Sequence, residues 1–120
     1  MKEIFLDQIL SYKIKENKDY LQGGFYLIQN TVSGKKYVGK SINYMSRLKQ
    51  HTFKSANKTL IDIDLNLNIS EFKFYLIKDY AELEINFFNR KKESIIEQEF
   101  IYKNNANYPL GYNIRCYGRL

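Results

Sequence analysis

Residues 24–39, with the sequence GFYLIQNTVSGKKYVG, decide the fold of this 120-residue chain. Residues of high β-propensity flank a turn signal at Ser33-Gly34, and each arm carries a tyrosine, Tyr26 in the first and Tyr37 in the second. The pattern predicts a β-hairpin with strands over about 24–30 and 35–40. Such a hairpin would bring two phenols close together at the start of the basic helix that follows.

The composition limits the classes of protein that the chain can belong to. Its 19 Lys and Arg residues against 13 Asp and Glu give a net charge of +6, which favours polyanions such as nucleic acid. A basic protein without a polyanionic partner is the alternative. Cys116 is the only cysteine and His51 the only histidine, which excludes an intramolecular disulfide, a cysteine-rich zinc site and any mechanism that needs two histidines.

Hydrophobic patterns predict the remaining elements around the hairpin. An amphipathic helix over 3–16 would cover the core or, in the alternative, contribute a dimer contact. Further along the chain the expected elements are a helix over 43–54, a short helix over 58–66, a strand over 72–77 and a helix over 91–104.

These elements predict a single compact α/β (α+β) domain over residues 23–120, preceded by an N-terminal helical extension over 1–22. Its centre would be a small three-stranded antiparallel sheet flanked by helices. No stretch has the length of a signal peptide or a membrane span, so we expect a cytoplasmic protein that does not enter membranes.

The helix after the hairpin carries the first candidate site residues. Tyr44, Arg47 and His51 fall at i, i+3 and i+7 and therefore share one face, beside the two tyrosines. The guanidinium fork of Arg47 could hold a phosphate through two hydrogen bonds. The alternative is an arginine on a solvated helix face.

The helix over 91–104 carries the candidate metal ligand. At 100° per residue, Glu99 lies inside the apolar arc of this helix, whereas Glu97 lies outside it. A carboxylate on a packed face needs a metal or another cation, with an ion pair as the competing explanation. One carboxylate without companions suggests a weakly held Mg²⁺ whose other ligands are water and a substrate phosphate. We therefore select Glu99.

Together these groups suit hydrolysis of a phosphodiester with one metal ion. The metal would stabilise charge on the leaving oxygen, and the arginine would stabilise the five-coordinate phosphorane. A phenol would help to activate water. A free tyrosine has a pKa near 10, so its surroundings would have to make it a better base.

In order and spacing, the residues resemble the GIY-YIG endonuclease superfamily, in particular the catalytic domain of phage homing endonucleases. Residues 24–26 look like the first block, with Phe25 in place of the usual isoleucine, and residues 37–39 look like the second. The arginine that follows the second block by eight residues is Arg47. Residues 95–102 resemble the helix with the metal-binding glutamate, and residues 111–113 resemble the closing motif.

The resemblance implies a role for each matching residue. Tyr26 would activate the attacking water, and Tyr37 would support it or contact the scissile phosphate. Arg47 would stabilise the transition state, with His51 assisting from the same helix face.

Two further residues receive roles from the same resemblance. Glu99 would bind the divalent metal, and Asn113 would brace the site from the closing motif. The implied cofactor is Mg²⁺, with Mn²⁺ able to substitute, and the implied substrate is double-stranded DNA.

Basic residues around the hairpin complete the prediction. Six lysines would contact phosphates without reading bases: Lys35, Lys36, Lys40, Lys49, Lys54 and Lys58. We predict a divalent-metal-dependent DNA endonuclease that forms no covalent intermediate and could act as a homodimer. The alternatives are a catalytically silent nucleic-acid-binding module and a protein-interaction domain on the same fold.

Overall fold

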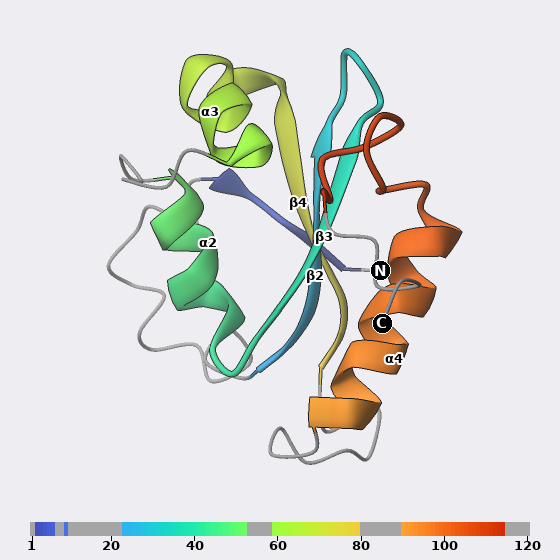
Figure 1. The fold of residues 1–120 in the computed structure, drawn as a ribbon. Helices are drawn as coiled ribbons and strands as arrows, with labels where there is room; N and C mark the ends of the chain where they lie inside the picture. The colour runs from blue at the N-terminus through green and yellow to red at the C-terminus, as the bar shows by residue number, and fades with distance from the viewer. Residues whose placement is uncertain (1, 7–8, 10–22, 53–58, 80–89, 115–120) are drawn as a thin grey trace.

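A four-stranded antiparallel sheet with the order β1-β4-β2-β3 forms the centre of the molecule (Figure 1). The structure is a computed structural model that describes residues 2–6, 9, 23–52, 59–79 and 90–114. Its elements are β1 (Lys2–Ile4), β2 (Gly24–Asn30), β3 (Lys36–Ser41), α2 (Tyr44–Thr52), α3 (Leu60–Leu67), a 3-10 turn (Ile69–Glu71), β4 (Phe72–Asp79) and α4 (Arg90–Lys103). The predicted fold class is confirmed, except that the sheet has four strands and not three.

The additional strand comes from the segment that was expected to start a helix. Lys2–Ile4 pairs with β4 instead, with Glu3 opposite Tyr75 and Ile4 opposite Phe74. The helical prediction for residues 3 and 4 was therefore wrong. Pairing with β4 satisfies backbone groups and buries the Ile4 side chain, which outweighs the local helical pattern. Most of the rest of the expected helix, with its dimer contact, lies outside the described residues.

The hairpin of β2 and β3 forms where the sequence predicts it. The register places Tyr26 opposite Gly39 and Ile28 opposite Tyr37. At the turn, the side-chain oxygen of Asn30 accepts hydrogen bonds from two backbone N–H groups, and Gly34 has a φ of +80°. A positive φ is readily available to glycine, which explains the turn signal.

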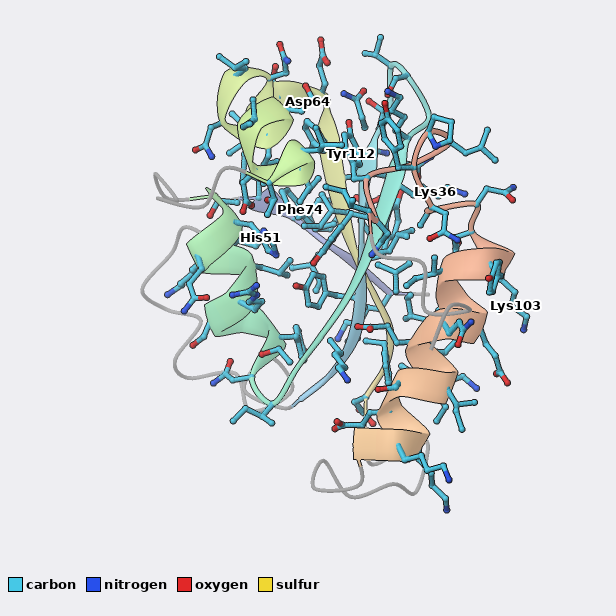
Figure 2. The ribbon with its side chains drawn as sticks, in the orientation of Figure 1. Lys36, His51, Asp64, Phe74, Lys103 and Tyr112 are labelled. Carbon is cyan, nitrogen blue, oxygen red and sulfur yellow. The ribbon has the colours of Figure 1, made fainter. Side chains whose placement is uncertain are left out.

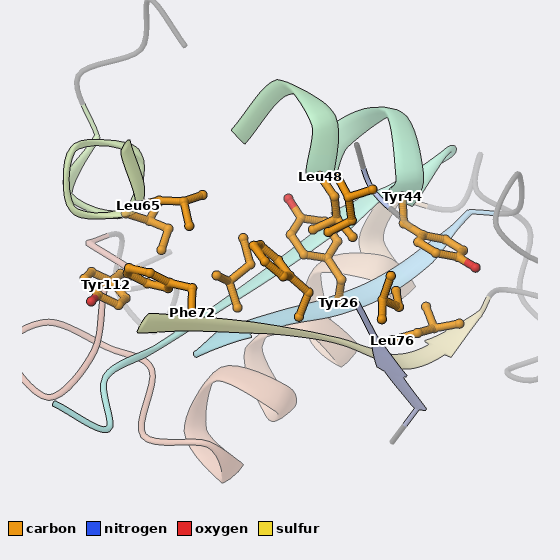
Figure 3. Packing of buried hydrophobic residues seen from close by; sticks show 12 residues of the cluster. Tyr26, Tyr44, Leu48, Leu65, Phe72, Leu76 and Tyr112 are labelled. Atoms are coloured by element: carbon orange, nitrogen blue, oxygen red, sulfur yellow. The ribbon is translucent and has the colours of Figure 1, made fainter. Parts of the chain in front are cut away.

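Helices cover both faces of the sheet. In Figure 1, α2 and α3 lie on one side of it and α4 on the other. Alternation along β2 sends Tyr26 and Ile28 to the face of α2 and α3, and Leu27 to the face of α4. The larger apolar cluster, drawn in Figure 3, lies on the first of these faces. The candidate site is therefore built on the side of α2 and α3.

The outer edge of β3 is covered by the loop after α4. The backbone N–H of Tyr112 donates to the carbonyl of Lys36 at 2.9 Å. The side chain of Asn113 both accepts from the N–H of Val38 and donates to its carbonyl, each at 2.9 Å. Asn113 thus pairs with Val38 as a neighbouring strand would, and it blocks the sheet edge.

Within the parts of the chain that the structure describes, no helix is long and apolar enough to span a membrane.

Candidate active site

Two tyrosines from the hairpin lie together above β3. The Tyr26 side chain is only 1% exposed, and its ring centroid is 6.2 Å from that of Tyr37. Gly39, opposite Tyr26 in the sheet, makes room for it, because a Cβ at this position would overlap the tyrosine ring. The glycine of the second motif block therefore lets the first tyrosine lie flat across the edge strand.

His51 connects this pair of phenols to α3. Its Nε2 is 3.0 Å from the Tyr26 hydroxyl, and its ring packs edge-on against Tyr37 with centroids 5.6 Å apart. Its Nδ1 lies 2.5 Å from Oδ1 of Asp62. Figure 2 shows His51 on the side of α2 that faces the sheet.

Asp62 is a member of this hydrogen-bonded cluster that sequence reasoning missed. Its side chain is 2% exposed, and the hydroxyl of Thr59 donates to its second oxygen at 2.8 Å. The spacing Thr59-x-x-Asp62 is a signal for the start of a helix, and Thr59 does cap α3. That signal places a carboxylate in the first turn of α3, but only the packing of α3 beside α2 brings it to His51.

Arg47 lines a cavity of about 420 Å³ together with Tyr37 and Asn113. The remaining wall residues are Thr59, Ile61, Tyr112 and Ile114. The Arg47 guanidinium donates to the side-chain oxygen of Gln50 at 2.9 Å, which holds it at the cavity. Three residues predicted for the site thus meet around one opening, with Tyr26 and His51 buried behind Tyr37.

The electrostatics of the phenols follow from burial. Burial raises the pKa of Tyr26 well above its usual value, and the neighbouring Tyr37 adds to the effect, whereas Arg47 opposes it. Burial likewise raises the pKa of Tyr37, again against the effect of Arg47. For Arg47, burial lowers the pKa, but the charge and hydrogen bonding of Tyr26 outweigh this and leave it raised. Both phenols therefore carry their protons at neutral pH unless a partner accepts one.

The expected position of Glu99 on the packed face of α4 was wrong. Glu99 is exposed, whereas Glu97 is only 6% exposed, and its charge acts on both Tyr26 and Tyr37. The helical arc was misjudged because the apolar residues Ile95 and Tyr102 face solvent, at 51% and 54% exposure. The buried stripe of α4 instead runs through Glu93, Glu97 and Ile101, at intervals of four residues.

The lysines occupy different environments. Lys40 lies 3.8 Å from the buried carboxylate of Glu93, so part of its charge is already paired. Lys35 is exposed, and Lys36 and Lys49 are partly exposed on β3 and α2. Lys54 and Lys58 lie outside the described residues.

A divalent metal would have few protein ligands here. No three His, Cys, Asp or Glu side chains among the described residues are grouped to hold a metal ion. The chemistry of the donors therefore fits a cation that is held by one carboxylate, with water and a substrate phosphate as its other ligands.

Comparison with known proteins finds relatives of the same fold. The family model of the GIY-YIG catalytic domain matches residues 22–113. Among solved structures, the catalytic domain of homing endonuclease I-TevI matches with a TM-score of 0.63 and 23% identity over 79% of this chain and 100% of that chain. A mutant of the I-TevI catalytic domain with a glutamate replaced by alanine matches with a TM-score of 0.63 and 22% identity, over 78% of this chain and 94% of that one. No curated protein gives a significant match.

Proposed function

Because the chain belongs to the GIY-YIG family of nucleases, we propose that it is a divalent-metal-dependent endonuclease that hydrolyses phosphodiester bonds in double-stranded DNA. The observation that carries the proposal is the convergence of Tyr37, Arg47 and Asn113 on one cavity, with the hydrogen-bonded Tyr26 and His51 directly behind it. These side chains match those that the resemblance to this family implies, and they come from four separate segments of the fold: β2, β3, α2 and the loop after α4.

We assign activation of water to the pair of phenols. Tyr37 is the phenol on the cavity wall, and Tyr26 is the one whose hydroxyl contacts His51 at 3.0 Å. Arg47 is placed to hold a phosphate oxygen and to stabilise the negative charge that develops on phosphorus. Asn113 braces this arrangement by fixing Val38, the neighbour of Tyr37, through two hydrogen bonds.

For the metal we propose Glu97 in place of Glu99. Glu97 is buried and its charge acts on both phenols, whereas Glu99 is exposed. A divalent cation such as Mg²⁺ or Mn²⁺ would supply Lewis-acid stabilisation of the phosphate oxygens. The carboxylate of Glu97 would be the protein ligand that holds this ion.

The alternative is a catalytically silent module that binds nucleic acid through the same basic surface. Retention of Tyr26, Arg47 and the buried Glu97 favours the enzyme, because binding alone does not require buried groups of this kind. A protein-interaction domain would bind its partner with weak dependence on salt, whereas DNA binding through phosphates weakens steeply as salt rises.

Cleavage of supercoiled plasmid DNA tests the proposal. Wild-type protein is expected to nick or linearise the plasmid with Mg²⁺ or Mn²⁺ and to stop when the metal is chelated. Arg47→Ala should lower the rate by about 10²- to 10³-fold, as expected for loss of one transition-state donor. Lys103→Ala, which changes an exposed cation in the last turn of α4, is the matched control and should cleave normally. Folded wild-type protein that binds DNA but never cleaves it would favour the silent module.

A further inference from the structure

A buried chain of three polar side chains runs from α3 to the sheet. Oδ1 of Asp62 is 2.5 Å from Nδ1 of His51, and Nε2 of the same ring is 3.0 Å from the Tyr26 hydroxyl. The three residues are 2%, 3% and 1% exposed. Water therefore has little access to these groups, which bond to one another and, at the two ends of the chain, also to Thr59 and Arg47.

For a neutral imidazole, the chemistry of the three groups sets the direction of these hydrogen bonds. A carboxylate can only accept, so the contact with Asp62 places a hydrogen on Nδ1 of His51. A neutral imidazole has one N–H, so Nε2 then carries a lone pair and accepts from the Tyr26 hydroxyl. Each group donates to the next, from phenol to imidazole to carboxylate.

Asp62 is held in its ionised, accepting form by its surroundings. Burial acts to raise its pKa, but hydrogen bonds from His51 and Thr59 outweigh burial and bring the pKa below the ordinary value. Thr59 occupies the second carboxylate oxygen at 2.8 Å. Both oxygens are therefore oriented, and Oδ1 stays directed at His51.

From this geometry we propose that Asp62 is a positioning residue of the nuclease, which keeps His51 in the tautomer that can take the proton of Tyr26. The inference rests on the proposed function and assigns the terminal proton acceptor for it. His51, and not free solvent, relieves the buried phenol of its proton. Asp62 then stabilises the imidazolium that results, as a buried carboxylate does beside a catalytic histidine.

The proton balance of the step is complete without another reactant. As the attacking oxygen bonds to phosphorus, the water gives one proton to the pair of phenols, and Tyr26 gives one proton to Nε2 of His51. The bond from phosphorus to the leaving oxygen breaks, and the leaving alkoxide takes a proton from solvent. His51 then returns its proton to solvent, which restores the resting state.

A purely structural role for Asp62 is the competing explanation. Asp62 lies in the first turn of α3 and bonds to the capping residue Thr59, so it could serve only to start the helix. That role predicts a loss of stability on substitution and no change in the tautomer of His51. Asp64, two residues further along the same helix, accepts from the Tyr112 hydroxyl and provides the matched control.

Nitrogen NMR of the full chain tests the tautomer directly. His51 is the only histidine, so ¹⁵N-histidine labelling of protein without a histidine tag gives a single imidazole to observe. At about pH 8, where a free histidine is neutral, the wild type should carry its hydrogen on Nδ1. Asp62→Ala should move it towards Nε2, the form that free histidine favours, whereas Asp64→Ala should leave it on Nδ1.

Steady-state cleavage kinetics test the consequence. Asp62→Ala is expected to lower kcat by about 10²-fold or more with KM nearly unchanged, because proton transfer is impaired and DNA contacts are not. Asp62→Asn keeps the size of the side chain but removes its charge, and its amide can turn an NH₂ group towards Nδ1. Its kcat should therefore stay low although the protein folds, which guards against a simple folding defect in the alanine variant. Asp64→Ala should keep the kcat of the wild type.

The outcomes separate this inference from the proposed function. A hydrogen on Nε2 in the wild type, or a wild-type kcat in folded Asp62→Ala, would overturn the role of Asp62 while leaving the nuclease intact. A wild type that never cleaves DNA would overturn the proposed function and the catalytic role of Asp62 with it. In that case the NMR measurement still decides the direction of the hydrogen bonds.

Discussion

Helices α2 and α4 both bring polar side chains to the site, but they differ in what they pack against. The inner face of α2 carries Tyr44 and Leu48, both fully buried in the large apolar cluster, with His51 at its end. The inner face of α4 carries two buried glutamates, while Ile95 on the outer face is half exposed. Hydrophobicity therefore indicates the buried face of α2 correctly and that of α4 wrongly.

The difference has a physical cause. α2 lies over the interior of the sheet, where its neighbours are apolar side chains, so burial of apolar surface decides its rotation. α4 runs beside β3, where Lys40 pairs with Glu93 and the phenols lie near Glu97. Buried carboxylates are stable there because opposite charge or a metal ion can compensate them. The inner face of a helix in such surroundings can therefore be polar.

The largest expected effect separates the two glutamates of α4. Glu97→Gln should lower cleavage by about 10³-fold, equivalent to about 4 kcal/mol, because a metal site without its carboxylate loses its stabilisation of the transition state. Glu99→Gln makes the same chemical change on the exposed face of the same helix and should cleave normally. Plasmid cleavage at several Mg²⁺ concentrations measures both variants. The opposite order would assign the metal to Glu99 and would mean that burial on α4 does not identify the ligand.

Stability should show the same contrast between the helices. Leu48→Ala removes a fully buried side chain of α2 and should lower the free energy of unfolding by about 3 kcal/mol. Ile95→Ala on α4 should change it by less than about 0.5 kcal/mol, because its side chain is half exposed. Urea denaturation of the two proteins gives the comparison. Equal losses would mean that α4 buries Ile95 in solution.

The smallest expected effect is the pH dependence of stability that comes from Asp64 in α3. Hydrogen bonds from Tyr112 and Asn68 outweigh burial and bring the pKa of Asp64 below its ordinary value. A lowered folded-state pKa contributes stability above the unfolded-state value, and this is lost as the pH falls through the folded-state value. Wild-type protein should therefore lose stability below about pH 4, and Asp64→Asn should lose less over that interval. Urea denaturation between about pH 3 and pH 7 measures this, and parallel curves for the two proteins would contradict it.

Much of the site could be predicted because its signals are local. The hairpin turn, the two tyrosines and the spacing to Arg47 and His51 all lie within 28 residues, from Gly24 to His51. Strand alternation and helical periodicity operate over such distances, so these side chains were expected on one side of the sheet. The structure places Arg47 and Tyr37 on the same cavity and His51 against Tyr26.

The parts that escaped prediction depend on contacts between distant segments. Asp62 becomes a site residue only because α3 packs beside α2, and Lys2–Ile4 becomes a strand only because the edge of β4 is free to pair with it. Local sequence patterns do not reveal either contact, because each joins segments that are far apart in the chain. The same holds for Glu97, whose burial depends on how α4 packs against the sheet.

The sequence by itself determined the hairpin, the α/β class and the nuclease family, since turn chemistry, strand alternation and motif spacing are properties of short segments. The tertiary structure decided which glutamate of α4 is buried, which carboxylate holds His51 and how the edge of β3 is covered by Asn113. Those features depend on charges and hydrogen bonds between segments far apart in the chain, whose pairing is settled only when the elements pack together.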